Sequence, residues 1–185
     1  MYLVDEWGVV FDKHFVSDHT VRESAHSALQ ERFAVHIDRQ GLATVRTEGV
    51  TAQAWFTMPT IRAAQLTVLT VELELAPGLH VYGRPLPEGY VPVELQVDGG
   101  DDLEVEQVVY PPAQPRYFAV IGETLPAYSG RVPIKARCLG RARQGRVKVH
   151  LTLRYQACDE TRCYLPERIA FELPLKVLAH DFERI

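Results

Sequence analysis

The chain has 185 residues, of which 46% are hydrophobic and 24% charged, so it can bury a core and is not disordered by composition. Its formal net charge is −4, without a block of like charges, so nothing predicts a nucleic acid or an anionic membrane surface as partner. No apolar run approaches the roughly 18 residues of a membrane-spanning helix. The acidic N-terminus lacks the pattern of a signal peptide. If the protein works outside the cytoplasm, we therefore expect it to be a fragment of a longer precursor, and a cytoplasmic location stays open.

Residues 1–40 differ in pattern from the rest of the chain. MYLVDEWGVVFDKHF predicts two short strands around a turn at Gly8, and residues 17–37 predict a helix with Ser17 or Asp18 as N-cap. A hairpin and a helix of this size bury little surface alone, so we expect them to pack on something else. Residues 41–51 show little periodicity and are interpreted as a linker, and residues 179–185 as a tail.

From Leu66 onward the pattern is mainly β. Several runs alternate apolar and polar residues with a period of two, turn residues separate them, and no helical pattern follows residue 40. Residues 52–178 are therefore predicted to form an immunoglobulin-like antiparallel β-sandwich. The Pro-rich segment 110–128 is expected to be a long irregular loop. The predicted inward faces are Leu69, Val71, Leu73 and Leu75; Val93, Leu95 and Val97; Val132, Ile134 and Ala136; Val147, Val149, Leu151, Leu153 and Tyr155; and Ile169, Phe171, Leu173, Leu175 and Val177.

The three cysteines differ in their phase on the predicted strands. Cys138 is in phase with Ala136, so its thiol is expected in the core. Cys158 is out of phase with Tyr155, so it is expected on the solvated face, where an unused cysteine is a liability. Cys163 follows after the polar turn DETR, and the two residues that flank such a turn can come within disulfide distance.

Three uses of the pair Cys158 and Cys163 are open. As a staple, a loop this small contributes roughly 2 kcal/mol, less than the ~3 kcal/mol of a 15-residue loop. A metal site needs two more ligands, and none of the seven histidines lies in this loop. An exposed bond that closes a tiny loop suits a disulfide that is made and broken, and the residues favour this redox-active use.

The stretch RYQACDETRCYLPERIAFELPL resembles the N-terminal periplasmic domain of the thiol:disulfide interchange protein DsbD family. In that family a Tyr-Gln-x-Cys segment precedes a second cysteine, an aromatic residue and proline. APGLHVYGRPLPEGYVPVELQV, YPP and AYSGRVPI are also similar to parts of this domain, so the likeness covers about residues 52–178. It implies an immunoglobulin-like fold whose cysteine pair relays reducing equivalents between proteins, without a cofactor or a metal.

The resemblance also implies roles for single residues. A cap is expected to shield the cysteine pair until a partner docks, and the more exposed Cys163 is expected to attack first. The cysteine spacing is one residue shorter than in the best-known members, and only Glu123 stands near the place of their acidic pair. The implied site residues are Cys158 and Cys163 as the active pair, Tyr155 and Tyr164 flanking it, and Phe118, Ile121 and Glu123 in the cap, with Phe118 or Ile121 as the apolar shield.

The segment YLVDEWGVVFDKHF and its predicted helix are similar to the last strands and helix of AhpC/TSA thioredoxin-like folds. The catalytic half of that fold is absent from this chain. The likeness implies a truncated thioredoxin-like domain with an uncovered apolar surface, and hence a possible homodimer. The alternative is a hairpin and helix packed on the sandwich.

Two functions follow from these readings. The first is a protein-disulfide oxidoreductase component that exchanges electrons with thioredoxin-like or other dithiol proteins, in the periplasm or at the outer cell surface. The second is a non-catalytic adaptor with a permanent disulfide, which docks a thioredoxin-like or peroxidase domain. His80, Tyr82 and Tyr90 either line a binding face or fill the core.

Overall fold

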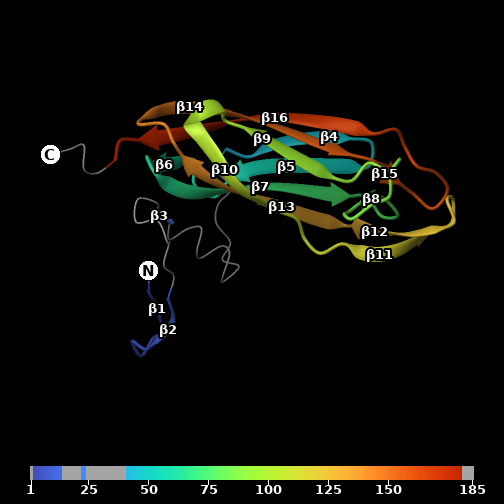
Figure 1. The fold of residues 1–185 in the computed structure, drawn as a ribbon, viewed down its shortest axis with the longest axis horizontal. Helices are drawn as coiled ribbons and strands as arrows, with labels where there is room; N and C mark the ends of the chain where they lie inside the picture. Colours follow the sequence, from blue (N-terminus) through green and yellow to red (C-terminus); the bar gives the residue numbers. More distant parts are fainter. Residues whose placement is uncertain (1, 14–21, 24–40, 181–185) are drawn as a thin grey trace.

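The computed structural model describes residues 2–13, 22–23 and 41–180, which form β-strands joined by turns and one short 3₁₀ helix (Figure 1). The strands and the 3₁₀ helix η1 are β1 (Tyr2–Val4), β2 (Val10–Lys13), β3 (Arg22–Glu23), β4 (Ala43–Thr47), β5 (Val50–Phe56), β6 (Thr60–Arg62), β7 (Gln65–Leu75), β8 (His80–Tyr82), β9 (Glu94–Asp98), η1 (Gly100–Asp102), β10 (Leu103–Val109), β11 (Gln114–Phe118), β12 (Glu123–Ser129), β13 (Arg131–Gly140), β14 (Gly145–Tyr155), β15 (Ala157–Cys158) and β16 (Glu167–Leu178). No helix in these described ranges is long and apolar enough to cross a membrane.

Two sheets stack face to face and form the body of the molecule (Figure 1). One sheet has the strand order β10-β13-β7-β5-β4, and the other has the order β6-β16-β14-β9. Leu73 and Ile134 of the first sheet share one buried core with Leu151 and Leu173 of the second. The predicted immunoglobulin-like antiparallel β-sandwich is therefore confirmed.

The register of β14 and β16 explains why the alternating pattern was informative. Val149 lies opposite Leu173, and Leu151 lies opposite Phe171, so apolar side chains of neighbouring strands meet on the core face. The predicted inward faces are buried, except that Val97 near the end of β9 is half-buried.

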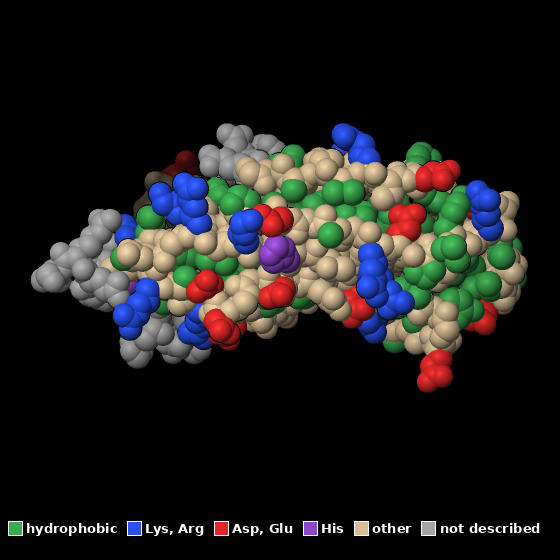
Figure 2. Space-filling view, turned by 90° about the horizontal axis from the view of Figure 1, so that it is seen from above, with side chains coloured by type: hydrophobic (Ala, Val, Ile, Leu, Met, Phe, Trp, Pro, Cys, Tyr) green, Lys and Arg blue, Asp and Glu red, His purple; other side chains and the backbone are tan. Residues whose placement is uncertain are grey.

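On the face seen in Figure 2, the Lys and Arg side chains are interspersed with Asp and Glu.

A third, smaller sheet lies at one end of the sandwich and has the order β11-β12-β8-β15 (Figure 1). Its β11–β12 hairpin occupies part of segment 110–128, where an irregular loop was predicted. The prediction is wrong for Gln114–Phe118 and for the part of β12 within the segment, because proline does not exclude a residue from every strand. Pro115 lies on the edge strand β11, where a residue without an N–H group is tolerated.

The N-terminal predictions have mixed outcomes. The hairpin is confirmed as β1 and β2, with the Asp5 side chain accepting hydrogen bonds from two backbone N–H groups of the turn. Within the predicted helix 17–37, Arg22 and Glu23 instead form β3, because the start of β7 offers them parallel sheet pairing. The rest of that helix lies outside the described residues, as do residues 181–185 of the predicted tail.

The linker prediction for residues 41–51 is wrong for its central part. Residues 43–47 form β4, which pairs with β5 through a two-residue turn at Glu48 and Gly49. Val50 at the start of β5 is buried in the main core. The sheet therefore begins before residue 52.

Cys138 lies on β13 as a free thiol without solvent exposure, which confirms its predicted place in the core. Burial, and next the charge of Glu106, raises its pKa from 9.0 to about 12. Between these values the unfolded chain has lost the thiol proton while the folded protein keeps it. Raising the pH through this window therefore favours the unfolded state.

We expect this thiol to make stability fall more steeply with pH in the natural protein than in a Cys138→Ala variant. Between pH 7 and pH 10, the free energy of unfolding should decrease by about 1.4 kcal/mol more in the natural protein. Urea unfolding of both proteins at the two pH values measures this difference. Equal losses would contradict a buried, protonated Cys138.

Candidate functional site

Cys158 and Cys163 are joined by a disulfide at the end of the molecule that carries the third sheet. The two residues face each other in an isolated antiparallel bridge. Tyr164 N–H donates to the Ala157 carbonyl oxygen (2.8 Å) and Asp159 N–H to that of Arg162 (2.9 Å), on either side of the cysteines. This is the pattern of a non-hydrogen-bonded pair, which brings Cα atoms closest, and the two Cα atoms are 4.0 Å apart. Residues 158–163 are called the redox loop below.

The structure corrects the predicted exposure of Cys158. Its residue surface is only 1% exposed, whereas Cys163 is half-buried. Counting phase from β14 failed because β14 ends at Tyr155, and the chain crosses at Gln156 into β15, which pairs with β8 of another sheet. Cys163 is thus the more exposed cysteine of the pair, as the family resemblance implies.

Tyr82 places its hydroxyl oxygen 3.2 Å from each sulfur of the disulfide. A disulfide sulfur carries no hydrogen, so the hydroxyl is the donor to either sulfur. Burial, followed by the neighbouring Tyr90 and the charge of Glu123, raises the pKa of Tyr82. The hydroxyl therefore keeps its proton at neutral pH and can stabilise negative charge on a sulfur.

A small apolar cluster covers the disulfide. Phe118, at the end of β11, is buried, and its ring centre lies 5.1 Å from that of Tyr82 and 6.3 Å from that of His80. Ile121, in the turn between β11 and β12, packs against the cluster from its rim. The buried members of this cap cluster are Tyr82, Phe118, Leu125, Ala127 and Cys158.

Glu123 is exposed at the start of β12. It accepts a hydrogen bond from Tyr90, and its charge, after burial, raises the pKa of Tyr90. The Tyr90 ring in turn packs edge-on against Tyr82, with 5.4 Å between ring centres. Glu123 thus contacts Tyr90 directly, and its charge, after burial, raises the pKa of both Tyr90 and Tyr82.

Tyr155 adjoins the pair in sequence but packs in the main core. Its hydroxyl donates to a carboxylate oxygen of Glu167 (2.6 Å) and lies 2.9 Å from the Thr47 hydroxyl. Burial comes first among the causes that raise the pKa of Tyr155. These hydrogen bonds connect β14 to β16 and β4, and they stabilise the end of the sandwich next to the redox loop.

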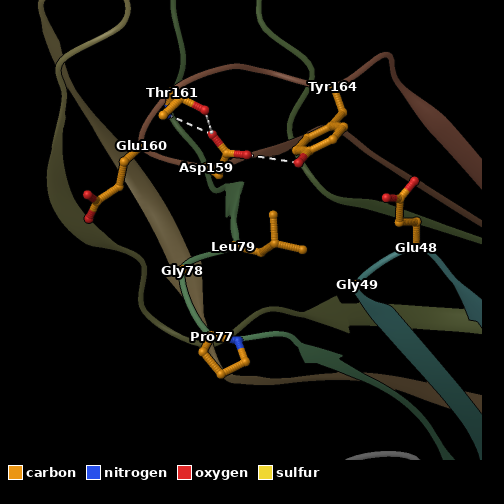
Figure 3. A pocket seen from close by; sticks show the side chains of 9 residues that line it. All are labelled: Glu48, Gly49, Pro77, Gly78, Leu79, Asp159, Glu160, Thr161 and Tyr164. Atoms are coloured by element: carbon orange, nitrogen blue, oxygen red, sulfur yellow. Dashed lines mark hydrogen bonds between the residues drawn. The ribbon is translucent and has the colours of Figure 1, made fainter.

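Tyr164 follows the redox loop and donates its hydroxyl hydrogen to Asp159 (2.8 Å), as Figure 3 shows. The same view shows the Asp159 carboxylate between Thr161 and Tyr164, beside an open cleft of about 430 Å³. The turns at Gly49 and Gly78 form the other side of this cleft. In the part of the chain described, no three His, Cys, Asp or Glu side chains are grouped so as to hold a metal ion.

Sequence reasoning missed the contact of Tyr82 with the sulfurs. The alternatives for Tyr82 were a binding face or core packing, and the structure shows a buried side chain that also contacts the reactive pair. The only signal in the sequence was the pattern LHVYG, which contains His80 and Tyr82 of β8. In the structure β8 pairs with β15, and this pairing brings His80 opposite Cys158. That pairing joins segments far apart in the chain.

We expect Tyr82→Phe to slow reduction of the disulfide by dithiothreitol about tenfold. Attack at one sulfur releases the other as a thiolate, and a hydrogen bond to a charged group contributes about 1.5–3 kcal/mol. Second-order rate constants at one pH measure the effect. Tyr90→Phe is the matched control, since it keeps the ring that packs on Tyr82. Equal rates for all three proteins would show that the Tyr82 hydroxyl has no part in exchange.

The fold and site together define a β-sandwich domain with a disulfide-bonded cysteine pair beneath an apolar cap. A family profile described as thiol:disulfide interchange protein DsbD, N-terminal, matches residues 49–175. The chain belongs to this family.

Solved structures with a similar fold are distant in sequence. The N-terminal periplasmic domain of ScsB from Proteus mirabilis is 21% identical with a TM-score of 0.49, and the match covers 80% of this chain and 56% of that one. The reduced DsbD N-terminal domain from Neisseria meningitidis is 19% identical with a TM-score of 0.42, over 58% of this chain and 77% of that one. A search of curated proteins gave no match.

Proposed function

We propose that this chain is a thiol–disulfide exchange domain that relays reducing equivalents between protein partners through Cys158 and Cys163. One observation carries the proposal within this family: the Tyr82 hydroxyl lies 3.2 Å from both sulfurs of a disulfide that a small apolar cluster covers. A staple requires neither a donor on its sulfurs nor a cover.

The reaction begins with a partner thiolate that attacks the Cys163 sulfur, the more exposed of the two. A partner–Cys163 bond forms, the Cys158–Cys163 bond breaks, and the electron pair goes to the Cys158 sulfur, where the Tyr82 hydroxyl donates to it. The partner's second thiol then displaces Cys163 and leaves an oxidised partner and a reduced domain. The reduced Cys163 thiolate passes the two electrons to the disulfide of the next protein by the reverse steps.

The cap hairpin, β11 and β12 with their turn, must shift before a partner reaches Cys163. Phe118 and Ile121 of this hairpin cover the disulfide. The Arg116 guanidinium also lies 3.5 Å from the Glu160 carboxylate of the redox loop. This ion pair is exposed and contributes little. The hairpin is therefore held mainly by the cap cluster, which a docking partner can replace with its own apolar contacts.

The partners proposed are thioredoxin-like or other dithiol proteins. Leu165, two residues after Cys163, is 86% exposed, and Val120 at the cap turn is exposed as well. Figure 2 shows hydrophobic side chains gathered toward the end of the molecule that carries the third sheet. A solved complex joins the DsbD and PilB N-terminal domains of Neisseria meningitidis. We propose a periplasmic or other extracytoplasmic location, since this chain belongs to the DsbD N-terminal family and the ScsB domain with a similar fold is described as periplasmic.

The N-terminal hairpin is proposed to resemble the end of a thioredoxin-like fold, and two chains are proposed to form a homodimer through it. Its support is the exposure of Val4 at the end of β1 and of Trp7 and Val9 in the turn that follows. Light scattering on the natural protein and on Trp7→Ser tests this. A dimer that Trp7→Ser weakens would support it, and a monomeric natural protein would overturn it.

The reduction potential of the pair decides between exchange and a permanent bridge. Titration in glutathione or dithiothreitol buffers, with Cys138 replaced by Ala, should give a value between roughly −180 and −280 mV. A value well below about −300 mV would identify a structural disulfide. The chain would then be an adaptor that docks a thioredoxin-like or peroxidase domain without exchange.

A further inference from the structure

We propose that Asp159 is a positioning residue of the redox loop, which holds Cys158 opposite Cys163 after the disulfide has been reduced. This inference rests on the proposed exchange function and deepens it. The observation that supports it is that the Asp159 carboxylate accepts hydrogen bonds from Thr161 and Arg162 of the loop and from Tyr164 just after it.

One oxygen of the carboxylate closes the turn between the two cysteines. Asp159 Oδ1 accepts hydrogen bonds from Thr161 N–H (2.7 Å), from the Thr161 hydroxyl (2.7 Å) and from Arg162 N–H (2.9 Å). In an ordinary hairpin the Arg162 N–H group would donate to the backbone carbonyl of residue 159. Here the side chain takes that place, so the turn depends on this carboxylate.

The second oxygen connects the turn to the strand that leaves it. Asp159 Oδ2 accepts the Tyr164 hydroxyl hydrogen (2.8 Å), and the Arg162 guanidinium lies 4.6 Å from the centre of the Tyr164 ring. Hydrogen bonds from Thr161, Tyr164 and Arg162 hold the pKa of Asp159 well below its usual range. The carboxylate therefore stays ionised and accepts hydrogen bonds at any pH where exchange takes place.

None of these hydrogen bonds involves a sulfur atom, so reduction does not remove any of them. Beyond the cysteines, Gln156 Nε2 donates to the Tyr164 carbonyl oxygen (3.0 Å), and Ala157 pairs with Val81 of β8. Both arms of the loop are thus held at their outer ends by β8 and Gln156, and at their inner ends by Asp159. The two thiols of the reduced protein remain neighbours, which lowers the entropy lost when the disulfide forms again.

Exchange with glutathione measures this preorganisation. The two protein thiols give two electrons and two protons to one glutathione disulfide, and the products are the Cys158–Cys163 disulfide and two glutathione thiols. We expect Asp159→Ala to lower the equilibrium constant of this reaction about tenfold, which equals ~30 mV toward a less negative potential. Asp159→Asn retains the oxygen acceptor and should stay within about threefold of the natural protein.

Two further variants make the result specific. Glu160→Ala is the matched control, since this exposed neighbour contacts Arg116 and leaves the turn intact. If Asp159→Ala does not fold, Thr161→Val removes one of the three donors and should shift the equilibrium constant about twofold in the same direction. All titrations are done with Cys138 replaced by Ala.

The outcomes separate this inference from the proposed function. A natural protein with a potential well below about −300 mV would overturn the exchange function itself. An exchanging natural protein whose equilibrium constant is the same in Asp159→Ala would overturn only the positioning role. The positioning role would be supported if Asp159→Ala lowers the equilibrium constant of exchange while Asp159→Asn and Glu160→Ala leave it close to that of the natural protein.

Discussion

A Cys158→Ser variant is expected to form a long-lived mixed disulfide at Cys163, whereas Cys163→Ser should react at least ~10-fold more slowly with the same reagent. The physical reason is accessibility. Cys158 is 1% exposed beneath the cap cluster, and Cys163 is half-buried at its rim. A reagent reaches Cys163 after a small shift of the cap, whereas it reaches Cys158 only after a larger opening, which costs more free energy.

The measurement is the second-order rate constant of each variant with oxidised glutathione, followed by mass spectrometry in a Cys138→Ala background. In guanidinium chloride both variants should react at similar rates, because unfolding removes the difference in exposure. Equal rates in the folded state would contradict the assignment of Cys163 as the sulfur that a partner attacks first.

Phe118→Ala is expected to expose the disulfide and to cost about 3 kcal/mol of stability, as large-to-small substitutions in a core do. Phe118 is 5% exposed, and its ring contacts those of Tyr82 and His80. Without the ring, water and small thiols reach the sulfurs without movement of the cap hairpin. The rate of reduction by dithiothreitol should therefore rise about tenfold, provided that the cap opens against a cost near 1.4 kcal/mol.

Leu125→Ala is the control for general loosening, because Leu125 is buried in the same cap cluster. It should lower the free energy of unfolding in urea without an equal rise in the reduction rate. If both variants accelerate reduction to the same extent, the effect would come from loss of packing in the whole cluster, and the shielding role of Phe118 would be wrong.

Strands with a continuous alternating pattern could be predicted well from the sequence. The period of two in β7, β13, β14 and β16 places apolar residues on one face, and burial of that face stabilises both the strand and its register. The same argument placed Cys138 correctly, because β13 runs unbroken from Arg131 to Gly140. The CDETRC segment indicated the cysteine pair and the family.

Elements whose place depends on a partner strand could not be predicted in this way. β4 and β11 are edge strands whose residues, apart from the buried Phe118, are half-buried or exposed. Their patterns are therefore weak, and hydrogen bonds to β5 and β12 decide them. Arg22 and Glu23 pair with β7 in spite of a helical pattern around them. Pairing over long sequence distances overrides local preference at such positions.

The sequence by itself therefore determined the sandwich, the buried Cys138 and the identity of the two disulfide-bonded cysteines, because each depends on residue type and local spacing. Only the tertiary structure decided that Cys158 is buried, that the Tyr82 hydroxyl lies within hydrogen-bond distance of both sulfurs and that Asp159 closes the loop. These features arise where the chain changes sheets after Tyr155 and β15 pairs with β8. Spacing along one strand carries no information about a neighbour that is far away in sequence, and Tyr82 is 76 positions from Cys158.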